Sequence, residues 1–263
     1  MYTILSHPST HVTAPFIYNH IFGAMGLDMV YISHDIPPVA LKDSIRSFSG
    51  WRNLGGFNVT IPHKENAAKM VDSLCEVSSR TGAVNTVVRN EDGRLSGYNT
   101  DGLGAIKALG DVRGEACLMI GAGGASRSIV DALLGSGVEK VFIMNRTREK
   151  ALALCSIFSN SEVSVYNGEP LKDIGVVVQA TPVSDQIPLG IDLSDFAPGT
   201  RILETIMRPT ALSEEAVRRK LRLVSGYAML YHQTNRNFEL LTGMDLPKKH
   251  LDDAFSYIGY RAP

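Results

Sequence analysis

Polar side chains suited to ligand binding and proton transfer gather where predicted strands end. The stretch Asn58–Lys64 places an asparagine, a threonine and a lysine between a predicted strand and a predicted helix. Further along, Asn85 and Asp101 occupy turn-like positions, and Gln233 lies on a late predicted helix. Ligands of open α/β sheets bind at the carboxyl ends of strands. The pattern therefore predicts a binding site that depends on the first part of the chain.

Each of these residues also has a purely structural interpretation. Lys64 alone fits a solvated lysine at the start of a helix. Asp101 alone fits a helix N-cap, because Thr100–Gly102 opens a helical stretch. Asn85 is typical of a turn, and Gln233 of a surface position on a helix. Only their combination favours a catalytic or ligand-binding role over a structural one.

A second group of candidate residues follows the buried-type strand predicted over Ala116–Ile120. The pattern Gly-x-Gly-x-x-Ser comes directly after it and precedes helical spacing. The first glycine permits a tight turn, and the second lets backbone amides approach a pyrophosphate at a helix N-terminus. A structural glycine-rich turn is the alternative. The candidate cofactor-binding residues of this stretch are Gly121, Ala122, Gly123, Gly124, Ala125 and Ser126.

The residues after the next predicted strand bear on which dinucleotide binds. An NAD-binding domain would carry a carboxylate there, about 20 residues after the first glycine. This chain has Asn145, Arg146 and Thr147 instead. Cationic and hydroxyl groups suit a 2′-phosphate, which a guanidinium binds through two hydrogen bonds. We predict NADP, with NAD as the alternative; Arg148 and Lys150 also fit a solvated, basic helix start.

Strand-like and helical runs alternate along the chain. Strands are predicted at Tyr2–Ser6, Asp28–Ser33, Gly56–Thr60, Val84–Arg89, Arg94–Tyr98, Ala116–Ile120, Val141–Met144, Val176–Gln179 and Arg201–Glu204. Helices are predicted at Pro15–Met25, Pro38–Phe48 and Met229–Leu241, with Pro62 suited to the first turn of another. An Asp-Gly turn predicts a hairpin between the fourth and fifth strands. The alternation predicts an α/β fold with parallel βαβ units.

The composition is that of a globular chain. Of the 263 residues 44% are hydrophobic and 20% charged, with a net charge of −1, which excludes wholesale disorder and suits one large or two medium domains. Without basic blocks there is no electrostatic footprint for nucleic acid or an anionic membrane. No apolar run reaches the ~18 residues of a spanning helix. The start lacks a signal-peptide pattern, and three scattered cysteines are typical of reduced core thiols, so we expect a cytoplasmic protein.

Taken together, the motifs resemble the shikimate dehydrogenase family over most of the chain. The motif blocks that carry the resemblance are Asn58–Lys64, Gly82–Thr86, Gly97–Asp101, Gly121–Ser126 with Asn145–Thr147, and Gly226–Gln233. The resemblance implies a Rossmann-type NADP domain at residues 102–226. It also implies a smaller α/β substrate domain built from both chain ends, residues 1–101 and 227–263, with the reaction in the cleft between the domains.

The resemblance further implies roles for single residues. Lys64 and Asp101 would flank the reacting hydroxyl as an acid–base pair. The substrate's ring hydroxyls would bind Asn58, Thr60, Asn85 and Gln233, and Gly226 and Met229 would complete the cofactor site. The chemistry agrees, because alcohol oxidation needs a base for the hydroxyl proton while hydride leaves for the nicotinamide. A lysine oriented by a carboxylate is such a base.

The chain departs from the family pattern where the substrate carboxylate would bind. Two family serines are Val12 and Ala14 here, and a family tyrosine is Met207. A buried carboxylate without hydroxyl partners is costly. Other polar residues of the same loop are His7, Ser9, Thr10, His11 and Thr13. Either these replace the lost hydroxyls, or the substrate carries a different group at that point, and we favour the second. Gln179, where the family has Asn, is a smaller departure.

The leading hypothesis is an NADP-dependent oxidoreductase that interconverts a ring alcohol and a ketone on shikimate or a close relative, a reaction of aromatic amino acid biosynthesis. A non-catalytic NADP-binding sensor of the same fold is the alternative, and it has no need of Lys64 and Asp101. A folate dehydrogenase-like enzyme ranks last, because it does not require the Asn58–Lys64 and Gly97–Asp101 blocks. We expect no metal, and either a monomer or a homodimer.

Overall fold

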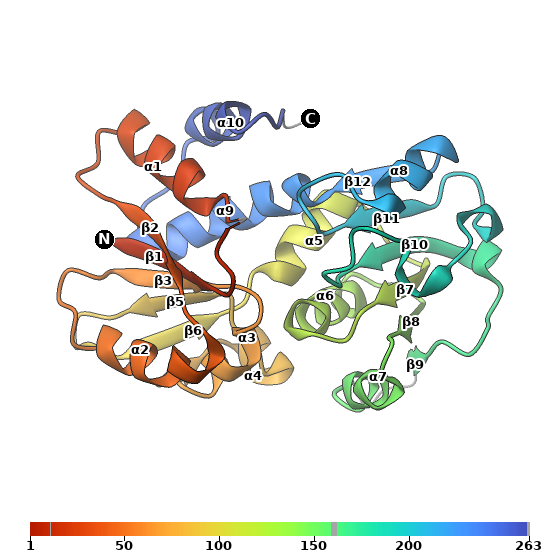
Figure 1. Cartoon of the computed structure of the whole chain (residues 1–263), viewed down its shortest axis with the longest axis horizontal. Helices are drawn as coiled ribbons and strands as arrows, with labels where there is room; N and C mark the ends of the chain where they lie inside the picture. The colour runs from red at the N-terminus through yellow and green to blue at the C-terminus, as the bar shows by residue number, and fades with distance from the viewer. Residues whose placement is uncertain (11, 159–161, 262–263) are drawn as a thin grey trace. The chain divides into compact units, whose positions relative to one another are not determined.

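The computed structural model describes residues 1–10, 12–158 and 162–261. The chain forms two compact units (Figure 1). Unit 1 consists of Met1–Thr100 and Gln233–Pro263, and unit 2 of Asp101–His232. Each unit contains one six-stranded sheet with helices against it, so the predicted α/β class is confirmed.

The sheet of unit 1 is mixed. Its strand order is β2 (Tyr31–Asp35), β1 (Tyr2–Ser6), β3 (Gly56–Val59), β5 (Thr86–Arg89), β6 (Leu95–Tyr98) and β4 (Ser73–Leu74). β1 is parallel to β2 and β3, as βαβ units require. The predicted hairpin makes β5 and β6 antiparallel, and β5 also pairs antiparallel with β3. β2 begins at Tyr31 and not at Asp28 as predicted, because its first pairing partner is Tyr2 at the start of β1.

Helices cover both faces of this sheet (Figure 1). α2 (Leu41–Phe48), α3 (Lys64–Ala68) and α4 (Glu76–Thr81) lie on one face, and α1 (Ala14–Ala24), α9 (Gly226–Thr242, from Gln233 onward in unit 1) and α10 (Lys248–Tyr257) on the other. Successive strand residues point to opposite faces. In β3, Phe57 and Val59 therefore join the core with α2 and α3. Gly56 lies against Leu241 of α9, and Asn58 points to the same side.

The start of α3 differs from the prediction. Pro62 does not lie in its first turn, because the His63 N–H donates to Thr60 O at 2.9 Å and closes a separate turn before the helix. α3 then begins at Lys64. The predicted placement of Pro62 was therefore wrong, whereas Lys64 is the first helical residue as expected.

The sheet of unit 2 is entirely parallel. Its order is β12 (Arg222–Ser225), β11 (Arg201–Glu204), β10 (Ile174–Gln179), β7 (Ala116–Ile120), β8 (Lys140–Met144) and β9 (Val163–Val165). α5 (Asp101–Leu109), α6 (Gly124–Gly135) and α7 (Arg148–Cys155) share a core on one face, and α8 (Ala211–Arg218) packs on the other. The strand order reverses between β7 and β10, the point at which such sheets bind ligands.

Other expectations concern cysteines, metals, membranes and charge. Cys117 is buried, and burial raises the pKa of its thiol. Cys75 and Cys155 are only half-buried, so the prediction of core thiols holds for Cys117 alone.

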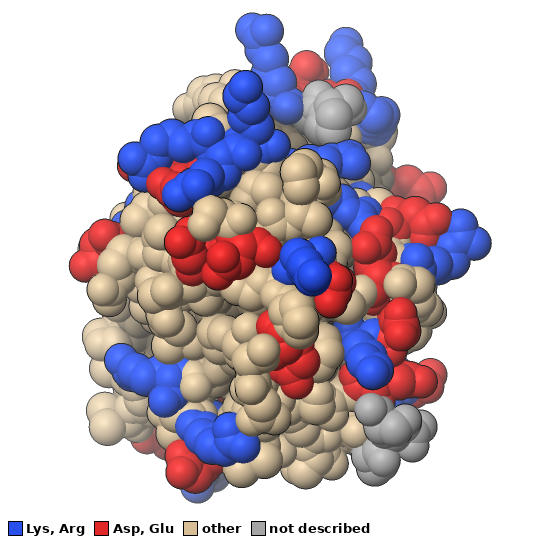
Figure 2. Space-filling view, turned by 90° about the vertical axis from the view of Figure 1, so that its right-hand side faces the viewer, with Lys and Arg blue, Asp and Glu red and all other residues tan. Residues whose placement is uncertain are grey.

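Among the described residues there is no metal-binding cluster of His, Cys, Asp and Glu. No helix in the described ranges is long and apolar enough to cross a bilayer. Basic and acidic side chains are interspersed over the face in Figure 2.

Candidate active site and cofactor-binding site

In unit 2 the glycine-rich turn lies at the carboxyl end of β7, where the strand order reverses. Gly121 has a φ of +113°. A Cβ atom there would lie 3.0 Å from both Ala180 O and Thr181 Cγ2, so conformation and space both require glycine. A Cβ atom on Gly123 would meet nothing within 4 Å. Gly123 therefore leaves open space in front of the first turn of α6.

The N-terminus of α6 fits the phosphates of a dinucleotide. The first N–H groups of a helix lack intrahelical acceptors, and the helix dipole favours an anion at this end. The Ser126 hydroxyl is buried and has no hydrogen-bond partner among the described residues. Ala122, Gly124 and Ala125 are half-buried around it. The open space at Gly123 suits a bound pyrophosphate, whereas a contact of the buried Ser126 hydroxyl with the cofactor stays a prediction.

The turn after β8 lies beside the glycine-rich turn, because Ile120 of β7 is paired with Met144 of β8. Asn145 Nδ2 donates to Thr147 O at 2.8 Å and fixes the turn. Arg146 is exposed there, which suits a guanidinium that binds a 2′-phosphate. Arg148 instead donates to Asn167 Oδ1 at 3.2 and 3.3 Å, which favours its structural interpretation.

Gln179 is the last residue of β10. This side chain is fully buried. Its Oε1 accepts the Thr181 N–H at 2.8 Å, and its Nε2 donates to Thr181 O and Val183 O at 3.1 Å. Gln179 therefore stabilises the turn that packs against Gly121.

Two predicted cofactor residues lie at the start of α9. A Cβ atom on Gly226 would lie 2.7 Å from Thr205 O, so glycine lets the helix begin directly beside the end of β11. Met229 packs in the core of unit 2 and is 6% exposed. Its position is that of a core residue, and its contact with the cofactor stays a prediction.

A buried carboxylate shapes the loop that contains Met207. Glu204 is 2% exposed and accepts hydrogen bonds from the Ile206 N–H at 3.0 Å and the Thr210 hydroxyl at 2.8 Å. Burial raises the pKa of Glu204. Arg208 donates to Ser184 Oγ at 3.1 Å and joins this loop to the one after β10. Met207 is thus held in a defined loop, half-buried.

In unit 1, Asn58 lies in a buried polar network between the sheet and α9. Its Oδ1 accepts the Tyr31 hydroxyl at 2.6 Å, and its Nδ2 donates to Asn85 O at 3.1 Å and to Thr86 Oγ1 at 2.9 Å. Burial raises the pKa of Tyr31 well above 10, which keeps it a donor. Both amide hydrogens of Asn58 have protein acceptors, so only its carbonyl oxygen suits the predicted contact with a substrate hydroxyl.

Hydrogen bonds bring three predicted site segments to one edge of this sheet. The Val84 N–H donates to Lys64 O at 3.0 Å, and the Thr100 N–H donates to Asn85 Oδ1 at 3.0 Å. Asp101, 1% exposed, follows directly and begins α5. Lys64 is half-buried at the start of α3. Lys64 belongs to unit 1 and Asp101 opens unit 2, and their pairing at one hydroxyl stays a prediction.

Two more predicted substrate residues belong to unit 1. Thr60, half-buried, follows the carboxyl end of β3. Gln233, 9% exposed, is the first residue of the returning chain segment. Their contacts with a substrate stay predictions, but both lie on elements that the network around Asn58 holds in place.

The loop after β1 is fixed by a carboxylate of the protein itself. His7 Nδ1 lies 2.7 Å from Asp35 Oδ1, and the Ser9 N–H donates to Asp35 Oδ2 at 3.0 Å. The hydrogen bond from His7 is the main reason why the pKa of Asp35 is lowered. Val12 and Ala14 are half-buried beyond this turn, and Ala14 begins α1. His11 lies outside the described residues.

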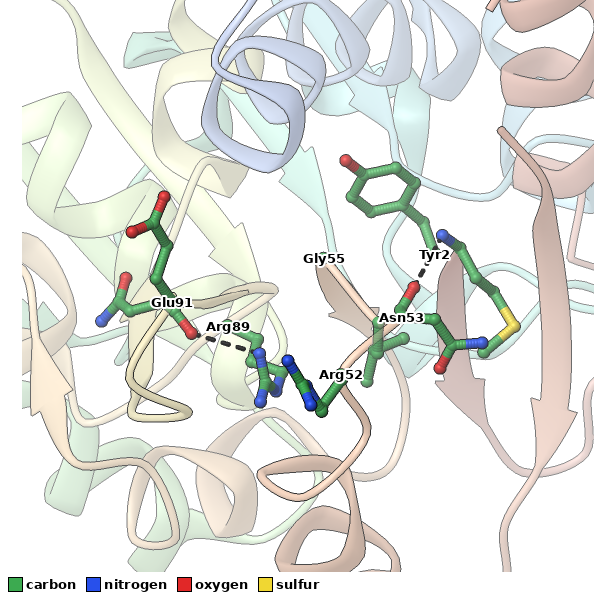
Figure 3. A pocket seen from close by; sticks show the side chains of 9 residues that line it. Tyr2, Arg52, Asn53, Gly55, Arg89 and Glu91 are labelled. Carbon is green, nitrogen blue, oxygen red and sulfur yellow. Dashed lines mark hydrogen bonds between the residues drawn. The ribbon is translucent and has the colours of Figure 1, made fainter. Parts of the chain in front are cut away.

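A pocket of about 650 Å³ opens elsewhere on unit 1 (Figure 3). It lies at the amino ends of β1 and β3, whereas Thr60 follows the carboxyl end of β3. The labelled lining residues are Tyr2, Arg52, Asn53, Gly55, Arg89 and Glu91. None of the predicted site residues lines this pocket, so it is distinct from the candidate active site.

Comparisons with known proteins agree with this geometry. Residues 4–87 match the model of the shikimate dehydrogenase substrate binding domain, and residues 104–188 match the shikimate / quinate 5-dehydrogenase model. A shikimate dehydrogenase (NADP(+)) of Rubrobacter xylanophilus is 37% identical, with 92% of this chain and 90% of the relative covered. The chain belongs to the shikimate dehydrogenase family.

Solved structures of shikimate dehydrogenases have the same fold. The Aquifex aeolicus enzyme has a TM-score of 0.88 at 31% identity, with 96% of each chain covered. The Thermus thermophilus enzyme, solved with NADP(H) and shikimate, has a TM-score of 0.86 at 31% identity, with 97% of this chain and 98% of that chain covered. The resemblance noted in the sequence and the two-domain Rossmann-type fold are thereby confirmed.

Several residues that hold the predicted site residues in place were not predicted. Tyr31, Thr86 and Asn237 hold the side chains of Asn58, Asn85 and Thr100. No local pattern marks Tyr31 and Asn237, because their partners Asn58 and Thr100 are 27 and 137 residues away in the sequence.

Proposed function

We propose that this protein is an NADP-dependent oxidoreductase that interconverts a secondary alcohol and a ketone on the ring of shikimate or a close relative. The observation that carries the proposal is the hydrogen-bonded edge of unit 1, where Lys64, Asn85 and the segment leading into Asp101 are tied together. Family membership supports the reaction class. The related NADP-dependent shikimate dehydrogenases cover nearly the whole chain.

The roles follow from the chemistry of the two ionisable groups. In the oxidation direction the Lys64 amine accepts the proton of the substrate hydroxyl, and in the reduction direction its ammonium returns it. The Asp101 carboxylate, at the N-terminus of α5, accepts a hydrogen bond from the substrate and orients the amine. The bound dinucleotide supplies the hydride acceptor or donor. Asn85 and Gln233 hold neighbouring hydroxyls, which fixes the face of the ring.

Unit 2 provides the groups that would hold NADP. The backbone N–H groups of Gly121–Ser126 suit its pyrophosphate, and Arg146 with Thr147 suits its 2′-phosphate. Asn145 keeps this turn in shape through its bond to Thr147 O. The exposed guanidinium of Arg146 supports NADP over NAD.

A separate question is which chemical group the substrate carries at the position of the shikimate carboxylate. Val12, Ala14 and Met207 offer no hydrogen-bonding side chain there, and His7 and Ser9 already bind Asp35. Asp35 also adds a negative charge to the loop, which disfavours a second carboxylate. These features support a shikimate-like ring compound in which an uncharged group replaces the carboxylate.

A turnover assay tests both the NADP-dependent reaction and the identity of the group at the carboxylate position. The protein is incubated with NADP⁺ or NAD⁺ and with shikimate, quinate and the carboxamide and hydroxymethyl analogues of shikimate, and the absorbance of the reduced nicotinamide is followed. We expect reduction of NADP⁺ in preference to NAD⁺, and a higher kcat/KM for the uncharged analogues than for shikimate. No turnover with any compound would overturn the enzyme proposal in favour of an NADP-binding sensor.

A further inference from the structure

Two threonine hydroxyls beside Asn85 each have a choice of acceptor. Thr86 Oγ1 lies 2.8 Å from Asn237 Oδ1 and 3.0 Å from Asn85 Oδ1. Thr100 Oγ1 lies 2.8 Å from Asn237 Oδ1 and 3.3 Å from Asn85 Oδ1. A hydroxyl has a single hydrogen, so each threonine donates to one of the two oxygens. The shorter distance favours Asn237 in both cases.

The other hydrogen bonds of these threonines agree with that direction. Thr86 Oγ1 accepts from Asn58 Nδ2 at 2.9 Å, and Thr100 Oγ1 accepts from Asn85 Nδ2 at 2.9 Å. Each threonine oxygen thus receives one hydrogen from an amide and passes its own to Asn237. The carbonyl oxygen of Asn237 is the common end of both chains of hydrogen bonds.

Burial makes this choice consequential. Thr86, Thr100, Asn85 and Asn237 are all less than 9% exposed, so bulk water is no ready substitute for a lost acceptor. Without the Asn237 oxygen, both hydroxyls would turn to Asn85 Oδ1, which already accepts the Thr100 N–H at 3.0 Å. A carbonyl oxygen has two lone pairs. A substrate hydroxyl would then compete with three protein donors.

We propose that Asn237 is a positioning residue that draws the two threonine hydrogens away from Asn85 and thereby sets how strongly Asn85 recognises a substrate hydroxyl. This inference rests on the proposed function and on the predicted role of Asn85. Asn237 also lies one turn after Gln233 on the same face of α9. One face of α9 thus carries Gln233, a predicted substrate contact, and Asn237, which acts on the predicted substrate contact of Asn85.

The experiment compares kcat and KM of the full-length protein for the accepted substrate and for analogues that each lack one ring hydroxyl. In the wild type, the analogue without the Asn85-bound hydroxyl should be penalised most. Asn237→Ala should reduce this penalty about tenfold, the equivalent of one hydrogen bond, and leave the penalties for the other analogues unchanged. Asn235→Ala on the same helix is the matched control, because the Asn235 amide donates to Glu239 Oε1 at 3.1 Å and lies outside the threonine network described above. It should behave as wild type.

Two further variants separate positioning from packing. Asn237→Asp keeps acceptor oxygens for both threonines and should retain the wild-type penalty. This variant keeps the inference testable if Asn237→Ala fails to fold. Adding Thr86→Val to Asn237→Ala removes one competing donor and should restore part of the penalty, whereas a packing role predicts a further loss. Unchanged discrimination in folded, active Asn237→Ala would overturn the inference alone. An inactive wild type would overturn the proposed function and the inference together.

Discussion

The two units prepare for their ligands in different ways. In unit 2 the proposed ligand-binding groups are mainly backbone N–H groups at the glycine-rich turn, and the neighbouring residues are small. In unit 1 they are side chains held by a buried network, in which Thr86 and Asn237 are 151 residues apart in sequence. A backbone site is specified by a short local pattern, whereas a side-chain site depends on the tertiary fold. Substitutions should therefore affect cofactor affinity in unit 2 and turnover or substrate choice in unit 1.

The largest expected effect is the loss of the proposed catalytic amine in unit 1. Lys64→Ala should lower kcat by about 10²–10⁴-fold, the range of general acid–base catalysis. NADP affinity, measured by fluorescence titration, should stay within a factor of about two if the two units act separately. Lys69→Ala, at the exposed end of the same helix, should leave both quantities unchanged. Retained turnover in Lys64→Ala would remove this residue from the mechanism.

A charge reversal in unit 2 should act on the cofactor instead. Arg146→Asp should weaken NADP binding by about 10–100-fold, the effect of losing a charge-assisted hydrogen bond, with little effect on NAD. The ratio of the two dissociation constants is the measurement. Lys150→Asp makes the same change of charge four residues further along, at an exposed position of α7, and should alter the ratio far less. Equal weakening of both cofactors by Arg146→Asp would contradict the role in reading the 2′-phosphate.

Two glycines of the same turn are expected to have different roles, one in the stability of the backbone and the other in the space for the cofactor. Gly121→Ala should destabilise unit 2 by about 1–2 kcal/mol, because an L side chain is strained at positive φ and would crowd Ala180 O and Thr181. Gly123→Ala should leave the melting temperature unchanged, since its Cβ meets nothing within 4 Å. It should nevertheless weaken NADP binding roughly tenfold, because the methyl group occupies the approach to the pyrophosphate. A lowered melting temperature in Gly123→Ala would contradict this division.

The same contrast explains how much could be predicted from the sequence. The strand Ala116–Ile120 and the helix after it were predicted correctly, because an apolar run followed by glycines is a local signal. The edge strands β9 and β12 were not predicted, since three or four residues that include polar ones do not stand out from a loop. The network around Asn85 was also missed. Its members are ordinary Asn, Thr and Tyr residues whose meaning comes only from the fold.

The smallest expected effect concerns the substrate loop of unit 1. Val12→Ser with Ala14→Ser should raise kcat/KM for shikimate about fivefold per useful hydroxyl, the effect of one added hydrogen bond to a carboxylate. It should not raise kcat/KM for the uncharged analogues, because they lack the acceptor. Val39→Ser, the same kind of change at a residue that is 90% exposed, is the control for general effects of a new hydroxyl. An equal gain for charged and uncharged compounds would show that this loop does not read the carboxylate, and specificity would then depend on Met207 and the loop held by Glu204.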